Sequence, residues 1–232
     1  MLRIEDLSVA YGNVKALEGV TLEVAHRGVL HGVIGPNGAG KSTLMDAITG
    51  RRKPTRGKVF VDGRDITHLN VVQRRRLGMS RSFQRTSIFP GIRVGEQLEL
   101  VASQLDENDL NGIVDTMQLA AVYDEIADSI AYGDQRRVDI ALALIGRPSL
   151  MLLDEPAAGL STSETVTLFE HLAAVVRKRN VTALVVEHDV DAVFRFCDAI
   201  TALDLGRLLA SGSPAEVRSN PLVIAAYLGT AA

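Results

Sequence analysis

One glycine-rich stretch has the residue types and spacing that bind phosphate. It satisfies the pattern GxxxxGK[S/T] in full, an apolar run precedes it, and the helix-forming segment after it ends at Gly50. Glycines let a backbone wrap around phosphate oxygens, and the N–H groups at the start of a helix face the negative charge. We expect this loop to bind a nucleoside triphosphate. Its residues are Gly35, Pro36, Asn37, Gly38, Ala39, Gly40, Lys41 and Ser42, followed by Thr43.

Two side chains of the loop and two acids far along the chain suit the chemistry of a bound triphosphate. Lys41 is expected to reach the β- and γ-phosphates, and the Ser42 hydroxyl to bind Mg²⁺. An apolar run ends in Asp154 and Glu155, at the edge where parallel sheets place their ligands. We expect Asp154 to hold Mg²⁺, directly or through water, and Glu155 to activate the attacking water as a general base. By itself the loop does not distinguish kinases, GTPases, helicases and transport ATPases.

These residues need a sheet to position them, and the apolar pattern predicts one. Continuous apolar runs are typical of strands buried on both faces of a parallel sheet. They occupy residues 29–34, 150–153 and 182–186. Residues 164–177 carry apolar side chains at the 3.6-residue period of a helix that packs on such a sheet.

The remaining elements predict an antiparallel β layer, a final hairpin and a helical insertion. Imperfect alternation of apolar and polar residues marks the antiparallel strands, at residues 2–9, 20–24 and 58–62. Residues 199–203 and 207–210, on either side of Gly206, predict the hairpin. We therefore expect one α/β domain with a P-loop NTPase fold of mainly parallel core sheet. Residues 1–84 and 149–232 would form the core, and residues 85–148 a helical subdomain.

Composition excludes some classes of protein. The net charge of −3 gives no reason to expect nucleic acid as a partner. The single cysteine, Cys197, cannot form an internal disulfide, and we expect it to pack as a small apolar residue. Glu5 and Asp6 interrupt the N-terminus where a signal peptide would be apolar, and no run reaches the about 18 apolar residues that span a bilayer. Any role at a membrane is expected to be peripheral.

Five further features occur in the order in which the ATP-binding cassette (ABC) family carries its motifs, and the chain resembles that family almost from end to end. The resemblance implies that Tyr11 stacks on adenine, that Gln84 helps to hold Mg²⁺ and contributes to catalysis, and that His188 is the switch histidine. The other two matches are the signature segment and the loop after the second acid. They comprise residues 130–137, with Ala131, Tyr132, Gly133 and Asp134 meeting the nucleotide of a partner chain, and residues 158–161.

A closer resemblance is to the ATPases of branched-chain amino acid importers and of the related urea and amide importers. The strings that carry it include RLGMSRSFQRTSIFP, IAYGDQRR, LLDEPAAGLS and GSPAEVRSNPLVIAAYLG. It implies ATP and Mg²⁺ as ligands and a peripheral position on the cytoplasmic face of the cell membrane. The implied partners are a second ATPase chain, either a paralogue or another copy, two transmembrane permeases and, indirectly, an extracytoplasmic solute-binding protein. A soluble ABC-type ATPase that acts on ribosomes or DNA is the rival from another class.

The chain departs from the family pattern at three positions, and several other residues are expected to have only structural roles. Ala131 replaces a serine that donates to the γ-phosphate, Tyr132 replaces a glycine, and Ser161 replaces an aspartate. We expect weaker closure at the signature segment as a result of the first two replacements. The third bears on communication between the two nucleotide sites, and the sequence predicts no direction for its effect. His31 is expected to be an ordinary strand residue. The two basic clusters are expected to be solvated: Arg51, Arg52 and Lys53, and Arg74, Arg75 and Arg76.

Overall fold

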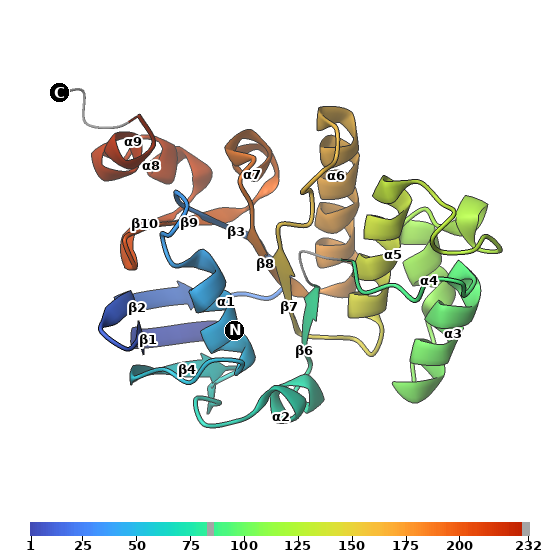
Figure 1. Ribbon diagram of the computed structural model, residues 1–232, viewed down its shortest axis with the longest axis horizontal. Helices are drawn as coiled ribbons and strands as arrows, with labels where there is room; N and C mark the ends of the chain where they lie inside the picture. Colours follow the sequence, from blue (N-terminus) through green and yellow to red (C-terminus); the bar gives the residue numbers. More distant parts are fainter. Residues whose placement is uncertain (83–85, 229–232) are drawn as a thin grey trace.

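The computed structural model describes residues 1–82 and 86–228, and its centre is a six-stranded sheet (Figure 1). The strand order is β10-β9-β3-β8-β7-β6, and all neighbours are parallel except β10 and β9. This confirms the parallel sheet and the final hairpin that the sequence predicts. The strands are Leu30–Ile34 (β3), Met79–Ser82 (β6), Leu150–Asp154 (β7), Thr182–Val186 (β8), Ala199–Asp204 (β9) and Arg207–Gly212 (β10).

A second, antiparallel sheet covers one face of the first. Its order is β2-β1-β4-β5. Its strands are Leu2–Tyr11 (β1), Val14–Val24 (β2), Arg56–Val61 (β4) and Arg64–Asp65 (β5). Helix α1 (Lys41–Thr49) lies between the sheets, where Leu44, Met45 and Ile48 are buried together with side chains from both. The helix that follows the phosphate loop is therefore held from both sides, which fixes the loop at its N-terminus.

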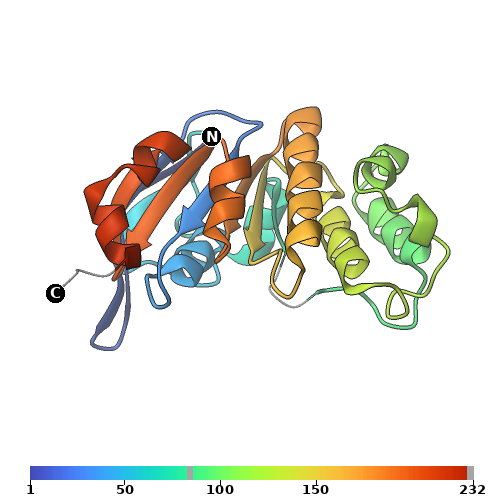
Figure 2. The ribbon, with the colours of Figure 1, turned by 90° about the horizontal axis from the view of Figure 1, so that it is seen from above.

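Helices cover the opposite face of the six-stranded sheet and extend the molecule at both ends. Figure 2 shows α3, α4 and α5 at one end, and α8 and α9 at the other. Among residues 1–82 and 86–228, no helix combines the length and apolar character needed to cross a membrane. The helices are Val71–Arg76 (α2), Val94–Gln104 (α3), Leu110–Thr116 (α4), Tyr132–Leu144 (α5), Thr162–Arg179 (α6), Val190–Phe196 (α7), Pro214–Arg218 (α8) and Pro221–Leu228 (α9), with a 3₁₀ turn at Ala120–Val122.

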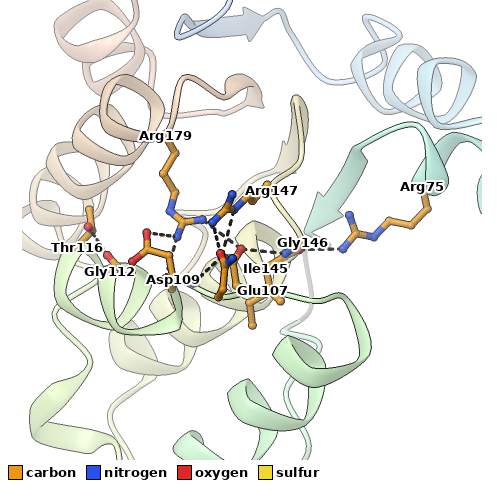
Figure 3. A network of polar contacts seen from close by, with 10 residues as sticks. Arg75, Glu107, Asp109, Gly112, Thr116, Ile145, Gly146, Arg147 and Arg179 are labelled. Atoms are coloured by element: carbon orange, nitrogen blue, oxygen red, sulfur yellow. Dashed lines mark hydrogen bonds and ion pairs between the residues drawn. The ribbon is translucent and has the colours of Figure 1, made fainter.

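A buried carboxylate joins the α3–α4 connection to the sheet core (Figure 3). The side chain of Glu107 is 0% exposed, and both Arg147 and Arg179 contact it at 3.4 Å. The backbone N–H of Gly146 donates to the same carboxylate. Arg179 also pairs with Asp109 at 2.8 Å. The end of α6 and the segment that precedes β7 therefore both bind the connection between α3 and α4.

Two features differ from what the sequence predicts. Strand β6 reads Met-Ser-Arg-Ser, so it has no apolar pattern, and its pairing with β7 makes it a strand. The expectation that the cluster at residues 74–76 is solvated is wrong for Arg74, which is 1% exposed. Its guanidinium donates to the carbonyls of Ala47 and Ile48, at the end of α1, where a helix leaves acceptors without intrahelical partners.

Candidate functional site

The glycine-rich loop adopts a conformation that only its glycines allow. Gly38 and Gly40 have φ of 82° and 101°, in the region that side-chain-bearing residues avoid. A Cβ at Gly40 would lie 2.7 Å from the Ala16 carbonyl oxygen, whereas a Cβ at Gly38 would meet no atom within 4 Å. Gly38 therefore borders open space, and a bulky anion has room to approach the backbone there.

The N-terminus of α1 opens into that space. Gly40 precedes the helix and offers no side-chain cap, so the first N–H groups of α1, which start at Lys41, have no side-chain acceptor on that residue. Unpaired N–H groups and the helix dipole favour a negative charge at this point. The Ser42 hydroxyl and the Thr43 backbone belong to the same turn. The cradle thus fits a phosphate group.

Lys41 is folded back into the loop. Its side chain is largely buried, and Nζ donates to the carbonyls of Gly35 at 2.6 Å and Pro36 at 3.2 Å. Burial lowers the pKa of Lys41, while the nearby charges of Glu155 and Asp154 raise it. The loop and the two acids, which are more than a hundred residues apart in sequence, are therefore brought together by the fold.

Asp154 ends β7 and is paired with an arginine that the sequence did not reveal. Arg81, on β6, reaches Asp154 with Nη2 at 2.7 Å and Asp46, on α1, with Nη1 at 2.6 Å. One guanidinium thus bridges the strand that carries the acid and the helix that follows the phosphate loop. Because β6 has no apolar pattern, no signal in the sequence placed Arg81 beside the site.

Glu155 and His188 form a close pair at the ends of β7 and β8. His188 Nε2 lies 2.8 Å from Glu155 Oε1. Glu155 has φ of 50°, a left-handed conformation that costs a residue other than glycine about 1–3 kcal/mol. Its N–H donates to the Val186 carbonyl at 2.8 Å, which ties it to the neighbouring strand. The surrounding structure therefore imposes this backbone conformation on Glu155.

The loop and the Glu155–His188 pair face one hollow of about 220 Å³. Its lining comprises Ala16, residues 37–43, Glu155 and His188. In the described part of the chain, no three His, Cys, Asp or Glu side chains gather to hold a metal by themselves. The donor set fits Mg²⁺, which typically takes one or two protein oxygens and completes its shell with phosphate oxygens and water. Ser42 lines the hollow, whereas Asp154 is paired with Arg81 and directly precedes Glu155 without being one of the lining residues. These two are the residues that would hold the ion.

The structure does not bring every predicted residue into this hollow. Tyr11 ends β1, is 44% exposed, and has the Arg52 guanidinium 4.1 Å from its ring centroid. Ala131, Gly133 and Asp134 line a separate hollow of about 220 Å³, beside α6. Gln84 lies outside the described residues.

The remaining predicted residues have structural partners. Ser161 caps α6, where its side chain and that of Glu164 satisfy each other's backbone N–H groups. His31 is buried in β3 with Nε2 2.8 Å from Thr201 Oγ1, and Cys197 is buried beside Gly32, as expected of residues that pack in the core.

One acid behind the site was missed entirely. Glu187 lies between β8 and His188, is 3% exposed, and accepts hydrogen bonds from the backbone N–H groups of Ala157 and His188. The available signal was a charged residue immediately after a fully apolar strand, next to a residue already singled out.

A phosphate-binding loop at the start of α1, facing an acid and a histidine at the carboxyl ends of a mainly parallel sheet, defines a P-loop nucleoside triphosphatase. Comparisons with known proteins narrow this class. The family model "ABC transporter" matches residues 17–158, and the model "Branched-chain amino acid ATP-binding cassette transporter" matches residues 207–232.

Individual relatives match over nearly their whole length. The chain is 36% identical to the high-affinity branched-chain amino acid transport ATP-binding protein LivG of Salmonella typhimurium, over 100% of this chain and 98% of LivG. It is 38% identical to BraF of Pseudomonas aeruginosa, which carries the same description, with the same coverage. A solved ATP-binding cassette of an ABC transporter in its ADP conformation superimposes with a TM-score of 0.88 at 29% identity, over 99% of this chain and 98% of the other. The chain belongs to the ABC transporter family and is an ATP-binding cassette ATPase.

Proposed function

We propose that this chain hydrolyses Mg-ATP at the hollow between the phosphate loop and the Glu155–His188 pair. The free energy of ATP hydrolysis would drive the uptake of branched-chain amino acids, or of related small polar solutes, through partner permeases. The observation that carries the chemistry is the 2.8 Å contact between His188 Nε2 and Glu155 Oε1 at the mouth of the loop. The full-length similarity to LivG and BraF supports the choice of solute.

The residues of the loop would bind and orient the triphosphate. The backbone N–H groups of residues 37–43 would surround the phosphates, and Lys41 would turn from the carbonyls of Gly35 and Pro36 toward the β- and γ-phosphates. Tyr11 would stack on the adenine. Ser42 and Asp154, with help from Gln84, would hold Mg²⁺, which would supply positive charge that offsets the charge developing on the phosphoryl oxygens.

The acid–histidine pair would carry the proton transfer. Glu155 accepts the proton of the attacking water, because its carboxylate reaches into the hollow and is only partly exposed. His188 holds that carboxylate through Nε2 and lies where it can contact the γ-phosphate. Positioning and electrostatic stabilisation then account for most of the rate, as in other phosphoryl transfers.

A second ATPase chain would complete the site. Ala131, Gly133 and Asp134 line a separate hollow beside α6, so this segment does not close over the phosphate loop of the same chain. We propose that it closes over the nucleotide of a paralogue or of another copy. Ala131 and Tyr132 lack the hydroxyl and the small size usual at these positions, and we expect this contact to be weaker as a result.

The test separates the importer from the soluble alternative. Tagged protein expressed in its native host should co-purify with hydrophobic permease subunits and show ATPase activity that requires Mg²⁺. Glu155→Gln should keep ATP binding, lose nearly all turnover and accumulate as a closed dimer. Co-purification with ribosomes or DNA instead would support the rival reading, and normal turnover by Glu155→Gln would remove Glu155 from the mechanism.

The solute needs a separate measurement, because the ATPase does not touch it. Calorimetry on the extracytoplasmic receptor of the same transporter should find branched-chain amino acids bound. Binding of urea or short amides in their place would identify the related importer class.

A further inference from the structure

Glu187 is a buried acid that the proposed chemistry does not use. It directly follows β8, is 3% exposed, and does not line the hollow that faces the phosphate loop. Burial raises the pKa of Glu187, and the hydrogen bonds from the backbones of Ala157 and His188 partly offset this rise. A buried acid is unfavourable unless its oxygens are satisfied, so its partners indicate what it does.

Both carboxylate oxygens accept hydrogen bonds from backbone groups next to the Glu155–His188 pair. Oε1 accepts from the N–H of Ala157 at 2.7 Å, and Oε2 from the N–H of His188 at 3.1 Å. Ala157 lies two residues after Glu155, on the turn that leaves β7. One side chain therefore holds the turn after the acid and the backbone of the histidine.

These contacts belong to a closed ring of hydrogen bonds that includes both Glu155 and His188. The chain reverses after Glu155, whose carbonyl accepts from Ala158 N–H at 3.1 Å. Glu155 itself is held in the left-handed conformation at φ 50° by its bond to Val186 and, beyond the turn, by the bond from Ala157 to Glu187. The 2.8 Å contact between the Glu155 and His188 side chains completes the ring.

We propose that Glu187 is a positioning residue that sets the distance and orientation of Glu155 and His188 by clamping their two backbones. This inference rests on the proposed role of that pair in hydrolysis. Glu187 does not line the hollow, so we assign it no contact with the nucleotide or with the attacking water. Misplacing reacting groups by about 1 Å costs on the order of 100-fold in rate, so loosening the clamp should act on turnover and spare nucleotide binding.

Glu187→Gln is a nearly isosteric test. The glutamine oxygen can accept from one of the two N–H groups, but its NH₂ cannot accept from the other, so one side of the clamp opens. We expect kcat for ATP hydrolysis to fall about 10- to 100-fold, with ATP Kd unchanged. Hydrogen exchange at the N–H of Ala157 or His188 should accelerate.

Glu107→Gln is the matched control, since it also removes the charge of a fully buried carboxylate. Glu107 lies in the α3–α4 connection, so this variant should lose stability while its folded fraction keeps the parental kcat. Parental kcat in Glu187→Gln, or an equal loss of kcat in both variants, would overturn the proposal.

Three further measurements ensure that every outcome supports or contradicts the proposal. If Glu187→Gln does not fold, Glu187→Asp keeps the charge on a side chain one methylene shorter, and the same drop in kcat at unchanged Kd is expected. In the parent, the N–H groups of Ala157 and His188 should be protected from exchange; free exchange at both would show that no clamp exists. Glu155→Gln, run in parallel, separates the two claims: if it hydrolyses ATP normally, the proposed role of Glu155 in the chemistry fails, whatever Glu187 does.

Discussion

Lys41 illustrates how a single side chain is prepared for its ligand. It donates to two carbonyls of its own loop, so the loop holds an ammonium in place. Because the side chain is already ordered, little conformational entropy is lost when it changes partners. The same residue is close enough to Asp154 and Glu155 for their charges to act on it.

We predict that Lys41→Ala weakens ATP binding rather than the chemical step alone. A hydrogen bond to a charged group contributes about 1.5–3 kcal/mol, which corresponds to roughly a 10- to 150-fold rise in Kd. Calorimetry with Mg-ATP would measure it, with Lys53→Ala, at an exposed lysine, as the control. Equal ATP affinity in Lys41→Ala and the parent would count against the phosphate-loop assignment.

At the scale of elements, α5 begins with an unusual residue. Ala131 is its N-cap and has no side chain that can accept from the first N–H groups of the helix. Serine at an N-cap position stabilises a helix by about 0.5–2 kcal/mol relative to alanine. The same hydroxyl would restore the donor that the family resemblance implies for the partner's γ-phosphate.

We therefore predict two effects of Ala131→Ser. The midpoint of chemical unfolding of the isolated chain should rise, and the ATP-dependent dimer of the Glu155→Gln background should become tighter. Denaturant titration and analytical ultracentrifugation measure these effects separately. A gain in stability without any change in dimerisation would mean that residue 131 does not meet the partner's nucleotide.

The connection between α3 and α4 is a second feature at this scale. Glu107 is contacted by Arg147 and Arg179 from the sheet core, and Arg75 donates to the Ile145 carbonyl nearby (Figure 3). A hydrogen bond to a charged group contributes about 1.5–3 kcal/mol, and Arg179 keeps its ion pair with Asp109 when the charge of Glu107 is removed. The helical region is therefore attached at this end by charge as well as by apolar packing.

Glu107→Gln should lower the free energy of unfolding by on the order of 2 kcal/mol, measured by urea titration. Asp106→Asn, at the neighbouring exposed acid, serves as the control and should have little effect. An equal loss in both variants would show that the network contributes nothing specific.

At the scale of the whole molecule, His31 links stability to pH. Burial lowers its pKa to about 4 from the ordinary value of 6.5. Between about pH 6.5 and 4, the unfolded chain therefore takes up a proton that the folded chain does not. The contribution of His31 to the free energy of unfolding is fully present above this range and is lost as the pH falls through it. The loss due to this group is about 3 kcal/mol.

The measurement is the free energy of unfolding from pH 7 to pH 4 in the parent and in His31→Gln. Glutamine can still bond to Thr201 but does not titrate, so the fall in stability with decreasing pH should be shallower in the variant. His68→Gln, at an exposed histidine, should keep the parental slope. If the free energy of unfolding has the same pH dependence in His31→Gln and in the parent, the lowered pKa of His31 is contradicted.

The sequence alone was enough to predict the class of fold, the phosphate loop and the strands that are apolar on both faces. The reason is local: the GxxxxGK[S/T] spacing, the glycines and the continuous apolar runs are properties of contiguous residues. It also predicted that Asp154 and Glu155 follow a strand, since their position needs only the end of that strand. The family resemblance extended this to Tyr11, Gln84 and His188.

Only the tertiary structure decided which residues support the site from other strands. Strand β6 exists because β7 pairs with it, and Arg81 reaches Asp154 because the two strands are neighbours. Arg74 is buried because the end of α1 needs donors. Glu187 holds the turn after Glu155 from thirty residues away. Each of these contacts joins segments distant along the chain, and no local pattern of residue types records such a pairing.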